Sequence, residues 1–207
     1  MRILLTRPEG RNEKLAERLR EAGHDVICEP LIALEPLSDE PVELDGYDWV
    51  LVTSATGAQE LRRRGRGRPK RFAAIGPATA EALGDADLVP RVSTQEGLLA
   101  ELPRPAGRVL FAGAEAARRL LVDELGADFV PLYRTRLLAP DLPDADLVVL
   151  ASPSASRAYA ALGGGAPAVS IGPETTRAAE AAGLEVISEA ANPDLDGVAD
   201  AVNAASR

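Results

Sequence analysis

The sequence predicts an α/β protein with two parallel sheets, each covered by helices on both faces. Three observations predict this class. Short apolar stretches alternate with helical stretches along the chain, a pattern typical of parallel strands joined by crossover helices. A strand, a Gly-Pro corner and an alanine-rich helix occur twice in the same order. Other segments repeat with a period near a hundred, which is too long for a solenoid and indicates two copies of one domain.

The repeat is clearest at the two Gly-Pro corners. Proline suits the first helical position, where its missing N–H costs nothing, and glycine suits the position just after the helix. Residues 72–84 match residues 169–183 with an offset of 172 − 76 = 96 positions, residues 48–55 match residues 146–153 with an offset of 146 − 48 = 98, and residues 2–6 resemble residues 108–112.

The chain begins with a buried-type strand at residues 3–5 and a helix over residues 12–22. Leu15 and Leu19 lie at i, i+4 and therefore face inward. A second strand follows at residues 25–29. The extended segment 30–37 is punctuated by prolines and is predicted to be a linker.

The middle of the chain predicts a set of five strands, at residues 49–53, 72–75, 88–89, 109–111 and 129–130, with its first helix over residues 58–63. Residues 131–138 alternate apolar and polar side chains like an extended strand and form the return linker. Strands at 147–151, 168–171 and 185–188 then complete the first set. We therefore expect a discontinuous domain (1–34 with 139–207), an inserted domain (38–131) and two linkers (30–37 and 131–138) that pair as an antiparallel ladder.

Composition excludes several classes of function. The formal charge of −9 argues against a general affinity for nucleic acid or anionic membrane, and the small aromatic content of 3% argues against stacking platforms. The single cysteine, Cys28, excludes an internal disulfide and fits a reducing compartment. With His24 as the only histidine, a transition-metal site is not expected. No long apolar run is present, so a cytoplasmic location is expected.

A basic run occupies residues 62–71. Three interpretations are open: a solvated loop between helix and strand, an electrostatic guide for an acidic substrate, or a nucleic-acid patch. Glycines break the helical register of the run and no aromatic residue lies within it. These two features favour the solvated loop over the guide, and the guide over the nucleic-acid patch.

Candidate site residues lie where the predicted strands end. Ligands of open parallel sheets bind outside the carboxyl ends of the strands, and a helix N-terminus with unpaired backbone N–H groups attracts anions. If the linkers turn the two sets of strand ends toward each other, they form a cleft lined by hydroxyl groups and helix N-termini. The candidate residues at these ends are Thr6, Arg7, Thr53, Ser54, Gly76, Pro77, Ser152, Pro153, Ser154, Gly172, Pro173 and Thr175.

Familiar catalytic motifs are missing from the sequence. The candidate serines have no credible histidine base, which argues against a hydrolase triad. The carboxylate pairs Asp39–Glu40 and Asp194–Asp196 lie in loops and are interpreted as caps and solvated residues. The predicted site is therefore rich in backbone N–H and hydroxyl groups and poor in fixed charge. Such a site suits a reaction in which catalysis comes from orienting the substrate.

Several segments together resemble the uroporphyrinogen-III synthase family. They are residues 5–10 (LTRPEG), 53–55 (TSA), the two Ile-Gly-Pro turns with their threonines, 131–135 (PLYRT) and 192–197 (NPDLDG). The resemblance implies two flavodoxin-like, doubly wound parallel-sheet domains, one inserted into the other and joined by a two-stranded linker. It implies a cofactor-free lyase that cyclises hydroxymethylbilane with loss of water and inversion of the last pyrrole ring. That substrate is a polyacid, which matches the predicted anion-binding helix N-termini.

The resemblance also assigns roles to single residues. Tyr133 matches the family's linker-proximal tyrosine, proposed to assist departure of the hydroxyl, and the alternative is a ring that fills the hinge. Thr79 and Thr175 match the threonines of the two Gly-Pro turns. Glu174 stands where many relatives have threonine, and Thr175 has capping as its alternative role. Arg7 could meet a substrate carboxylate or pair with Glu9.

The competing function is a non-catalytic, two-domain binding protein that closes on an anionic small molecule. A glycosyltransferase or nucleotide enzyme is a third reading, but the sequence lacks clear nucleotide-contacting residues. We expect no cofactor, no metal, no nucleic-acid or membrane partner, and a monomer.

Overall fold

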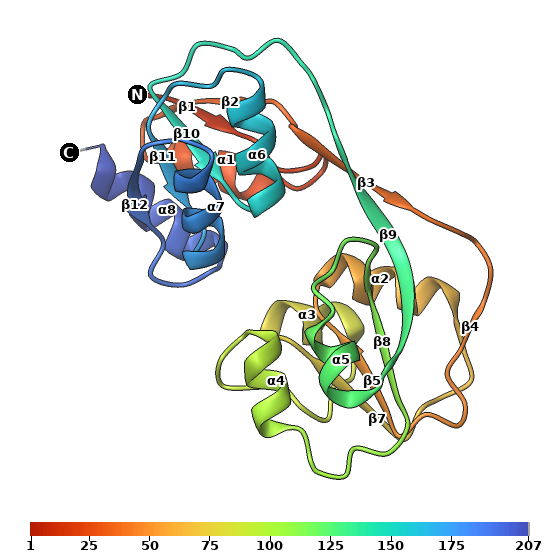
Figure 1. The fold of residues 1–207 in the computed structure, drawn as a ribbon. Helices are drawn as coiled ribbons and strands as arrows, with labels where there is room; N and C mark the ends of the chain where they lie inside the picture. The colour runs from red at the N-terminus through yellow and green to blue at the C-terminus, as the bar shows by residue number, and fades with distance from the viewer. Residues whose placement is uncertain (207) are drawn as a thin grey trace. The chain divides into compact units, whose positions relative to one another are not determined.

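The structure, a computed structural model, describes residues 1–206. It divides the chain into two compact units: unit 1 comprises Met1–Leu34 and Arg136–Arg207, and unit 2 comprises Glu35–Thr135. The red and blue segments of Figure 1 together build unit 1, and the orange to green segments build unit 2. None of the helices formed by the described residues has the length and apolar character needed to cross a membrane.

Unit 1 contains one sheet of five parallel strands in the order β12-β11-β10-β1-β2. Its strands are β1 (Arg2–Leu5), β2 (Asp25–Cys28), β10 (Leu147–Leu150), β11 (Ala168–Ser170) and β12 (Val186–Glu189). Its helices are α1 (Glu13–Glu21), α6 (Pro153–Ala161), α7 (Pro173–Ala181) and α8 (Leu195–Ala205).

Both faces of this sheet are buried, because successive side chains of a strand point to opposite faces. Ile3 and Leu5 of β1 pack in one apolar cluster with residues of α1 and α8, such as Leu19 and Val202. Leu4, between them, packs in a second cluster with residues of α6 and α7. The continuous apolar strands of unit 1 are therefore explained by a sheet with helices on each side.

Unit 2 contains a sheet in the order β3-β9-β8-β5-β7 and a separate two-stranded sheet, β4-β6. The strands are β3 (Ile32–Pro36), β4 (Val42–Glu43), β5 (Trp49–Val52), β6 (Gly65–Arg66), β7 (Arg71–Ala74), β8 (Val109–Ala114) and β9 (Asp128–Leu137). The helices are α2 (Ala55–Arg64), α3 (Pro77–Leu83), α4 (Gln95–Glu101) and α5 (Leu120–Leu125). Strands β5, β7, β8 and β9 are parallel.

Strands β3 and β9 cross the division between the units and are neighbours in the sheet order. Leu37 N donates to Leu132 O (3.1 Å), and Leu138 N donates to Leu31 O (2.9 Å). Since the later residue of one segment bonds to the earlier residue of the other, the two segments run in opposite directions.

The two units have the same spatial order of strands once their sequence repeat is taken into account. The repeat pairs β5 with β10, β7 with β11 and β8 with β1. In unit 1 the order is β12-β11-β10-β1-β2. In unit 2 it is Leu88-β7-β5-β8-β9, with Leu88 joined to Ala73 by a single parallel bridge. The parallel strands of unit 2 are therefore a circular permutation of those of unit 1: the first of them, β5, corresponds to β10, the third strand of unit 1.

Some sequence-based elements differ from the structure. The predicted strand at residues 88–89 is only the bridge at Leu88. The predicted strand 129–130 and the following segment form one ten-residue strand, β9. Helix α2 begins at Ala55 rather than at residue 58, because the Ser54 hydroxyl accepts a hydrogen bond from Gly57 N and caps its first turn. The small sheet β4-β6 was not predicted, since each of its strands has only two residues.

Candidate active site

In unit 2, the structure brings together two of the candidate residues, Tyr133 and Ser54. Ser54 follows β5 and is the N-cap of α2, with its Oγ 2.9 Å from Gly57 N. Tyr133 lies in β9, two strands away in the sheet, and only 8% of it is exposed. Ser54 Oγ and Tyr133 Oη lie 3.0 Å apart and share a hydrogen bond. A phenol is thereby held at the carboxyl end of β5, beside a helix N-terminus.

The other two tyrosines have structural partners. Tyr159 Oη in unit 1 accepts a hydrogen bond from Ala166 N (3.1 Å). Tyr47 Oη donates to Asp128 Oδ2 (2.8 Å), and the Arg108 guanidinium lies over its ring. Burial and the Asp128 carboxylate raise the pKa of Tyr47. Among the hydrogen bonds of residues 1–206 described above, that of the Tyr133 hydroxyl is the one that reaches a residue at the carboxyl end of a strand.

The Gly-Pro corner of unit 2 begins α3. Gly76 is its N-cap and has no side chain to bond the first-turn N–H groups, and Pro77, at the first position of the helix, is exposed. A Cβ at Gly76 would lie 2.8 Å from Ser93 Oγ and 3.3 Å from Ser93 Cβ, so Ser93 would have to move to admit a larger residue. Thr79 is buried, and its backbone N donates to Gly76 O. Thr53, at the end of β5, is half-buried.

The Gly-Pro corner of unit 1 begins α7. Gly172 is buried without a side-chain cap, Pro173 is exposed, and Thr175 is buried. A Cβ at Gly172 would have only Pro193 Cβ near it, at 4.0 Å. This corner is therefore less crowded than its counterpart in unit 2.

A polar cluster beside this corner was missed by sequence reasoning. Thr176 Oγ1 lies 2.6 Å from Ser170 Oγ and also donates to a carboxylate oxygen of Glu189. Ser170 ends β11 and Glu189 ends β12. In the sequence, the polar residues at the ends of these two strands could have indicated a polar site. Their contact with Thr176 could not be predicted without the order of the strands in the sheet.

The serine corner of unit 1 repeats that of unit 2. Ser152 is the N-cap of α6, and its Oγ accepts from Ala155 N at 3.1 Å. Pro153 occupies the first helical position, and Ser154 is half-buried, with its Oγ 3.4 Å from Arg157 Nη2. Thr6, at the end of β1, is fully buried and donates its hydroxyl proton to Val149 O (2.8 Å). The Thr6 hydroxyl therefore joins two strands of the sheet.

Arg7 follows Thr6 and is half-buried. Burial lowers the pKa of its guanidinium, and the positive charge of Arg11 acts in the same direction. Within residues 1–206, Arg7 forms no ion pair with a carboxylate, Glu9 included. Asn12 Nδ2 donates to Arg7 O (3.0 Å) and closes the loop that carries Arg7. The Glu13 carboxylate acts in the opposite direction and raises the pKa of Arg7, without forming an ion pair with it. A partly desolvated cation that forms no ion pair is suited to pair with an anionic ligand.

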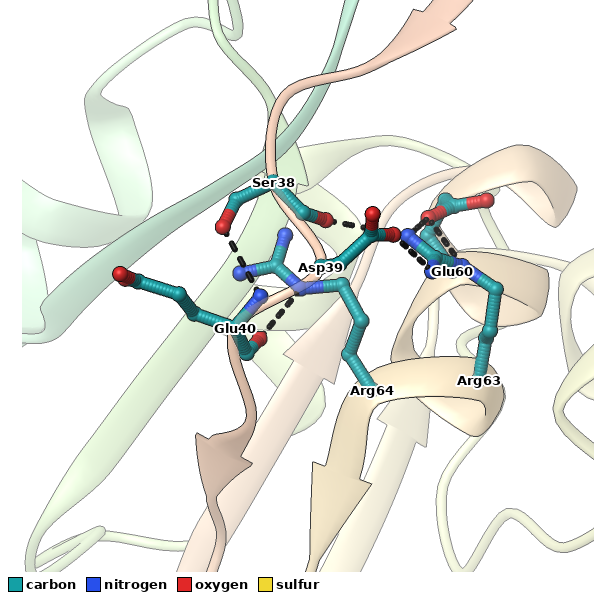
Figure 2. Close-up of polar contacts among 6 residues, drawn as sticks. All are labelled: Ser38, Asp39, Glu40, Glu60, Arg63 and Arg64. Atoms are coloured by element: carbon teal, nitrogen blue, oxygen red, sulfur yellow. Dashed lines mark hydrogen bonds and ion pairs between the residues drawn. The ribbon is translucent and has the colours of Figure 1, made fainter.

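The basic run of residues 62–71 is more ordered than the predicted loop. Its first residues form the last turn of α2 and the short strand β6. Figure 2 shows Arg63 and Arg64 reaching the segment Ser38–Glu40. Arg63 contacts Asp39, Glu60 (2.8 Å) and Ser38 O (3.0 Å), whereas Arg64, only 6% exposed, donates to Glu40 O at 2.8 Å.

Other cations of the run also have local partners. Arg68 pairs with Asp85 (2.9 Å), Lys70 pairs with Asp48 (2.6 Å), and Arg71 lies over the Trp49 ring. Arg63, Arg68 and Lys70 are therefore paired with carboxylates, whereas Arg64 donates to a carbonyl oxygen and Arg71 lies over a ring.

A search of the described residues for three or more neighbouring His, Cys, Asp or Glu side chains finds no group that could hold a metal ion. The chemistry available at the strand ends is that of hydroxyls, a phenol, one partly desolvated guanidinium and helix N-termini. The fold and these residues define the class: an α/β protein with parallel sheets whose carboxyl ends present hydroxyl groups, backbone donors and one guanidinium.

Comparison with known proteins identifies the family. A protein-family model described as uroporphyrinogen-III synthase HemD matches residues 13–200. The chain therefore belongs to the uroporphyrinogen-III synthase family. It is 30% identical over 173 residues to the uroporphyrinogen-III synthase of Synechococcus elongatus, covering 72% of this chain and 65% of that protein. It is 29% identical over 149 residues to a putative uroporphyrinogen-III synthase of Methanocaldococcus jannaschii, covering 65% of this chain and 62% of that protein. The chain thus matches a little less than two thirds of each relative's length.

Solved structures agree with the fold. A mutant uroporphyrinogen III synthase from the extremely thermophilic bacterium Thermus thermophilus superposes with a TM-score of 0.64 at 16% identity, covering 100% of this chain and 98% of that chain. The wild-type enzyme of the same bacterium gives a TM-score of 0.52 with the same identity and coverage. At this identity the likeness establishes the α/β fold with parallel sheets, as predicted from the sequence.

Proposed function

We propose that this protein is a uroporphyrinogen-III synthase that converts hydroxymethylbilane to uroporphyrinogen III, with loss of water and inversion of the last pyrrole ring. The observation that carries the proposal is the 3.0 Å hydrogen bond between Tyr133 Oη and Ser54 Oγ at the N-terminus of α2. The chain belongs to this family, and the hydrogen bond holds a phenol at the carboxyl end of a parallel sheet, which is where ligands of such sheets bind. Both facts support the proposal.

Tyr133 supplies the proton for the leaving group in this proposal. The C–O bond of the terminal hydroxymethyl group breaks, and the departing oxygen takes the phenol proton and leaves as water. The α-carbon of the last pyrrole ring that carries the bridging methylene forms a C–C bond to the methylene carbon that lost its hydroxyl. The bond from this α-carbon to its bridging methylene then breaks, and the bridging methylene bonds to the other α-carbon of the same ring, which inverts the ring. That second α-carbon releases its proton, which restores the phenol. The reaction loses one water and needs no cofactor.

Arg7 pairs with a carboxylate of the substrate in this proposal. Its partly desolvated guanidinium and the lack of an ion pair with residues 1–206 support this role. The N-terminus of α7, which begins at Gly172 and Pro173, offers a further N–H donor at Glu174, since Pro173 has none and the N–H groups of Thr175 and Thr176 bond to Gly172 O. Further hydroxyl or backbone contacts come from two groups of residues. One group lies at the start of α6 (Ser152, Pro153 and Ser154), and the other lies in unit 2 (Thr53, Gly76 and Pro77).

Three threonines have a different role in this proposal. Thr6, Thr79 and Thr175 are all at least nine-tenths buried, and the Thr6 hydroxyl already bonds to Val149 O. Burial supports a role in shaping the strand ends and the two Gly-Pro corners, and the contacts to substrate come from the backbone around them.

We also propose that the units are flavodoxin-like domains joined by the segments of β3 and β9. The strands of unit 1, numbered within the unit, have the order 2-1-3-4-5, which is that of flavodoxin. A monomer in the cytoplasm completes the proposal, with the single cysteine as support for a reducing compartment. Sedimentation equilibrium tests the monomer: a dimer mass at micromolar concentration would refute it.

The decisive experiment adds the purified protein to freshly prepared hydroxymethylbilane and separates the uroporphyrinogen isomers by chromatography. We expect isomer III, in amounts that rise with enzyme concentration. If isomer I, the uncatalysed product, is the sole product, the proposed activity is wrong and a non-catalytic binding protein becomes the better interpretation. Calorimetry with the same bilane measures that binding.

A further inference from the structure

The Ser54–Tyr133 hydrogen bond gives Ser54 a role other than the predicted contact with substrate. Ser54 Oγ accepts a hydrogen bond from Gly57 N at 2.9 Å and lies 3.0 Å from Tyr133 Oη. A serine hydroxyl has one proton and two lone pairs. Since one lone pair is used by Gly57 N–H, the hydroxyl proton is available for the phenol oxygen.

The surroundings of Ser54 favour this direction of the hydrogen bond. A hydroxyl that accepts one hydrogen bond is polarised and becomes a better donor for the next. Ser54 also lies at the N-terminus of the ten-residue helix α2, where the helix dipole is positive. The positive N-terminus of α2 stabilises negative charge on the Tyr133 oxygen. It also disfavours an arrangement in which the Tyr133 hydroxyl proton points toward the helix.

We propose that Ser54 is a positioning residue: it donates its proton to Tyr133 Oη, holds the phenol at the N-terminus of α2 and stabilises the phenolate that forms when Tyr133 gives up its proton. The inference rests on the proposed function. When Tyr133 gives up its proton, the Ser54 O–H and the N-terminus of α2 stabilise the resulting phenolate, until the proton released on ring closure restores the phenol. Ser54 itself forms and breaks no covalent bond.

The serine corner of the other unit is built differently. Ser152 caps α6 through Ala155 N in the same way, but the tyrosine of its own unit, Tyr159, accepts a hydrogen bond from Ala166 N instead. Capping alone therefore accounts for Ser152. For Ser54 the same cap is combined with a phenol, which is why we assign it a function beyond the helix.

The test is a double-mutant cycle on isomer III formation, with Ser54→Ala, Tyr133→Phe and the double variant. We expect Ser54→Ala to lower kcat about tenfold, the effect of one hydrogen bond that matters in the transition state, with KM changed less than about twofold. In the Tyr133→Phe background the same substitution should have no further effect, because it acts through the phenol. Ser54→Thr, which retains a hydroxyl and a cap, should restore most of kcat.

Two further variants separate this role from helix capping. Ser54→Gly removes the hydroxyl but costs only a few tenths of a kcal/mol in capping, and should lower kcat as Ser54→Ala does. Thr94→Ala removes an equivalent cap of α4 in the same unit, where Thr94 Oγ1 accepts from Gly97 N at 3.0 Å, and should leave kcat unchanged.

Three outcomes overturn the inference: a rise in KM at constant kcat, an equal loss of kcat in the Tyr133→Phe background, or full activity of Ser54→Gly. The first would make Ser54 a substrate contact. Failure of the proposed function is a separate result, since it appears as isomer I alone with the wild-type protein.

Discussion

The carboxyl ends of the two sheets share their backbone plan but differ in the side chains placed on it. Each unit has a serine N-cap after one strand, Ser54 or Ser152, and an uncapped Gly-Pro corner after the next. Unit 2 adds a phenol, Tyr133, to its serine. Unit 1 instead carries a guanidinium, Arg7, that forms no ion pair with residues 1–206.

This difference separates what the two copies of the scaffold share from what each one adds. The features present twice are backbone donors and caps, which hold an anion without proton chemistry. The features that the units do not share are the phenol of Tyr133 at the serine corner of unit 2 and the guanidinium of Arg7 in unit 1. Under the proposed function, proton transfer belongs to unit 2 and recognition of a carboxylate to unit 1, and substitutions in each unit test this division.

The largest expected effect is that of Tyr133→Phe in unit 2. We expect kcat for isomer III to fall at least about a hundredfold, the usual contribution of a positioned general acid. The free energy of unfolding should fall by only about 1 kcal/mol, the value of one hydrogen bond. Stopped assays and thermal unfolding measure the two quantities.

Tyr159→Phe in unit 1 is the matched control. It removes the hydroxyl that accepts from Ala166 N, so it should cost a similar amount of stability without lowering kcat. If both variants lose activity equally, proton transfer is not confined to unit 2.

A smaller effect is expected for Arg7→Gln in unit 1. Loss of a charge-assisted hydrogen bond to a substrate carboxylate should raise KM about tenfold with little change in kcat. Arg2→Gln is the control at the other end of the same strand, since Arg2 pairs with Asp25 at 3.2 Å and is far along β1 from the site. An unchanged KM for Arg7→Gln would remove the carboxylate contact from unit 1.

The two Gly-Pro corners should differ in their tolerance of alanine. At Gly76 a Cβ would lie 2.8 Å from Ser93 Oγ, whereas at Gly172 the nearest atom lies at 4.0 Å. We expect Gly76→Ala to lower the free energy of unfolding by about 1–3 kcal/mol, as overpacking does. Gly172→Ala should change it by less than about 0.5 kcal/mol. Equal losses in urea unfolding would contradict the difference in crowding.

The smallest effect is a difference in acid sensitivity. Hydrogen bonds from Lys70 and Arg108 N hold the pKa of Asp48 below its usual value, and those from Tyr47 and Arg108 do the same for Asp128. Both residues lie in unit 2. A carboxyl whose pKa is lower in the folded state stabilises the fold above its unfolded pKa, and this contribution is lost as the pH falls through the folded pKa.

Unit 2 should therefore lose stability below about pH 4. Trp49, the only tryptophan, lies in unit 2 and reports its unfolding by fluorescence. The pH dependence of this signal should become shallower in Asp48→Asn. An identical acid transition in wild type and variant would show that these pairs add nothing to the stability of unit 2.

The fold was largely predictable from the sequence because its signals are local. Apolar strands such as residues 3–5 and 147–150 alternate with helices, and the Gly-Pro corners repeat at a constant offset. These signals predicted α/β architecture with parallel sheets, which the structure and the comparisons confirm. The strand at residues 88–89 was wrong because two apolar residues beside Pro90 sustain only one bridge.

The site was less predictable because its contacts depend on strand order. Ser54 and Tyr133 are 79 positions apart in the sequence, and only the order β9-β8-β5 brings them together. The Thr176 cluster was missed for the same reason: it needs β11 beside β12. Thr6 and Thr175 are buried by the packing of distant segments around them. Their burial could therefore not be predicted from the motifs in which they lie.

The position of β10 in the middle of the unit 1 sheet has a consequence for biosynthesis. On the ribosome, the β1–β2 pair emerges early but has no neighbour on the far side of β1 until β10 has been translated. All the parallel strands of unit 2 precede β10 in the sequence, so unit 2 can assemble its sheet while the apolar edge of β1 still awaits its partner. A nascent chain stalled in that interval is the species most in need of a chaperone.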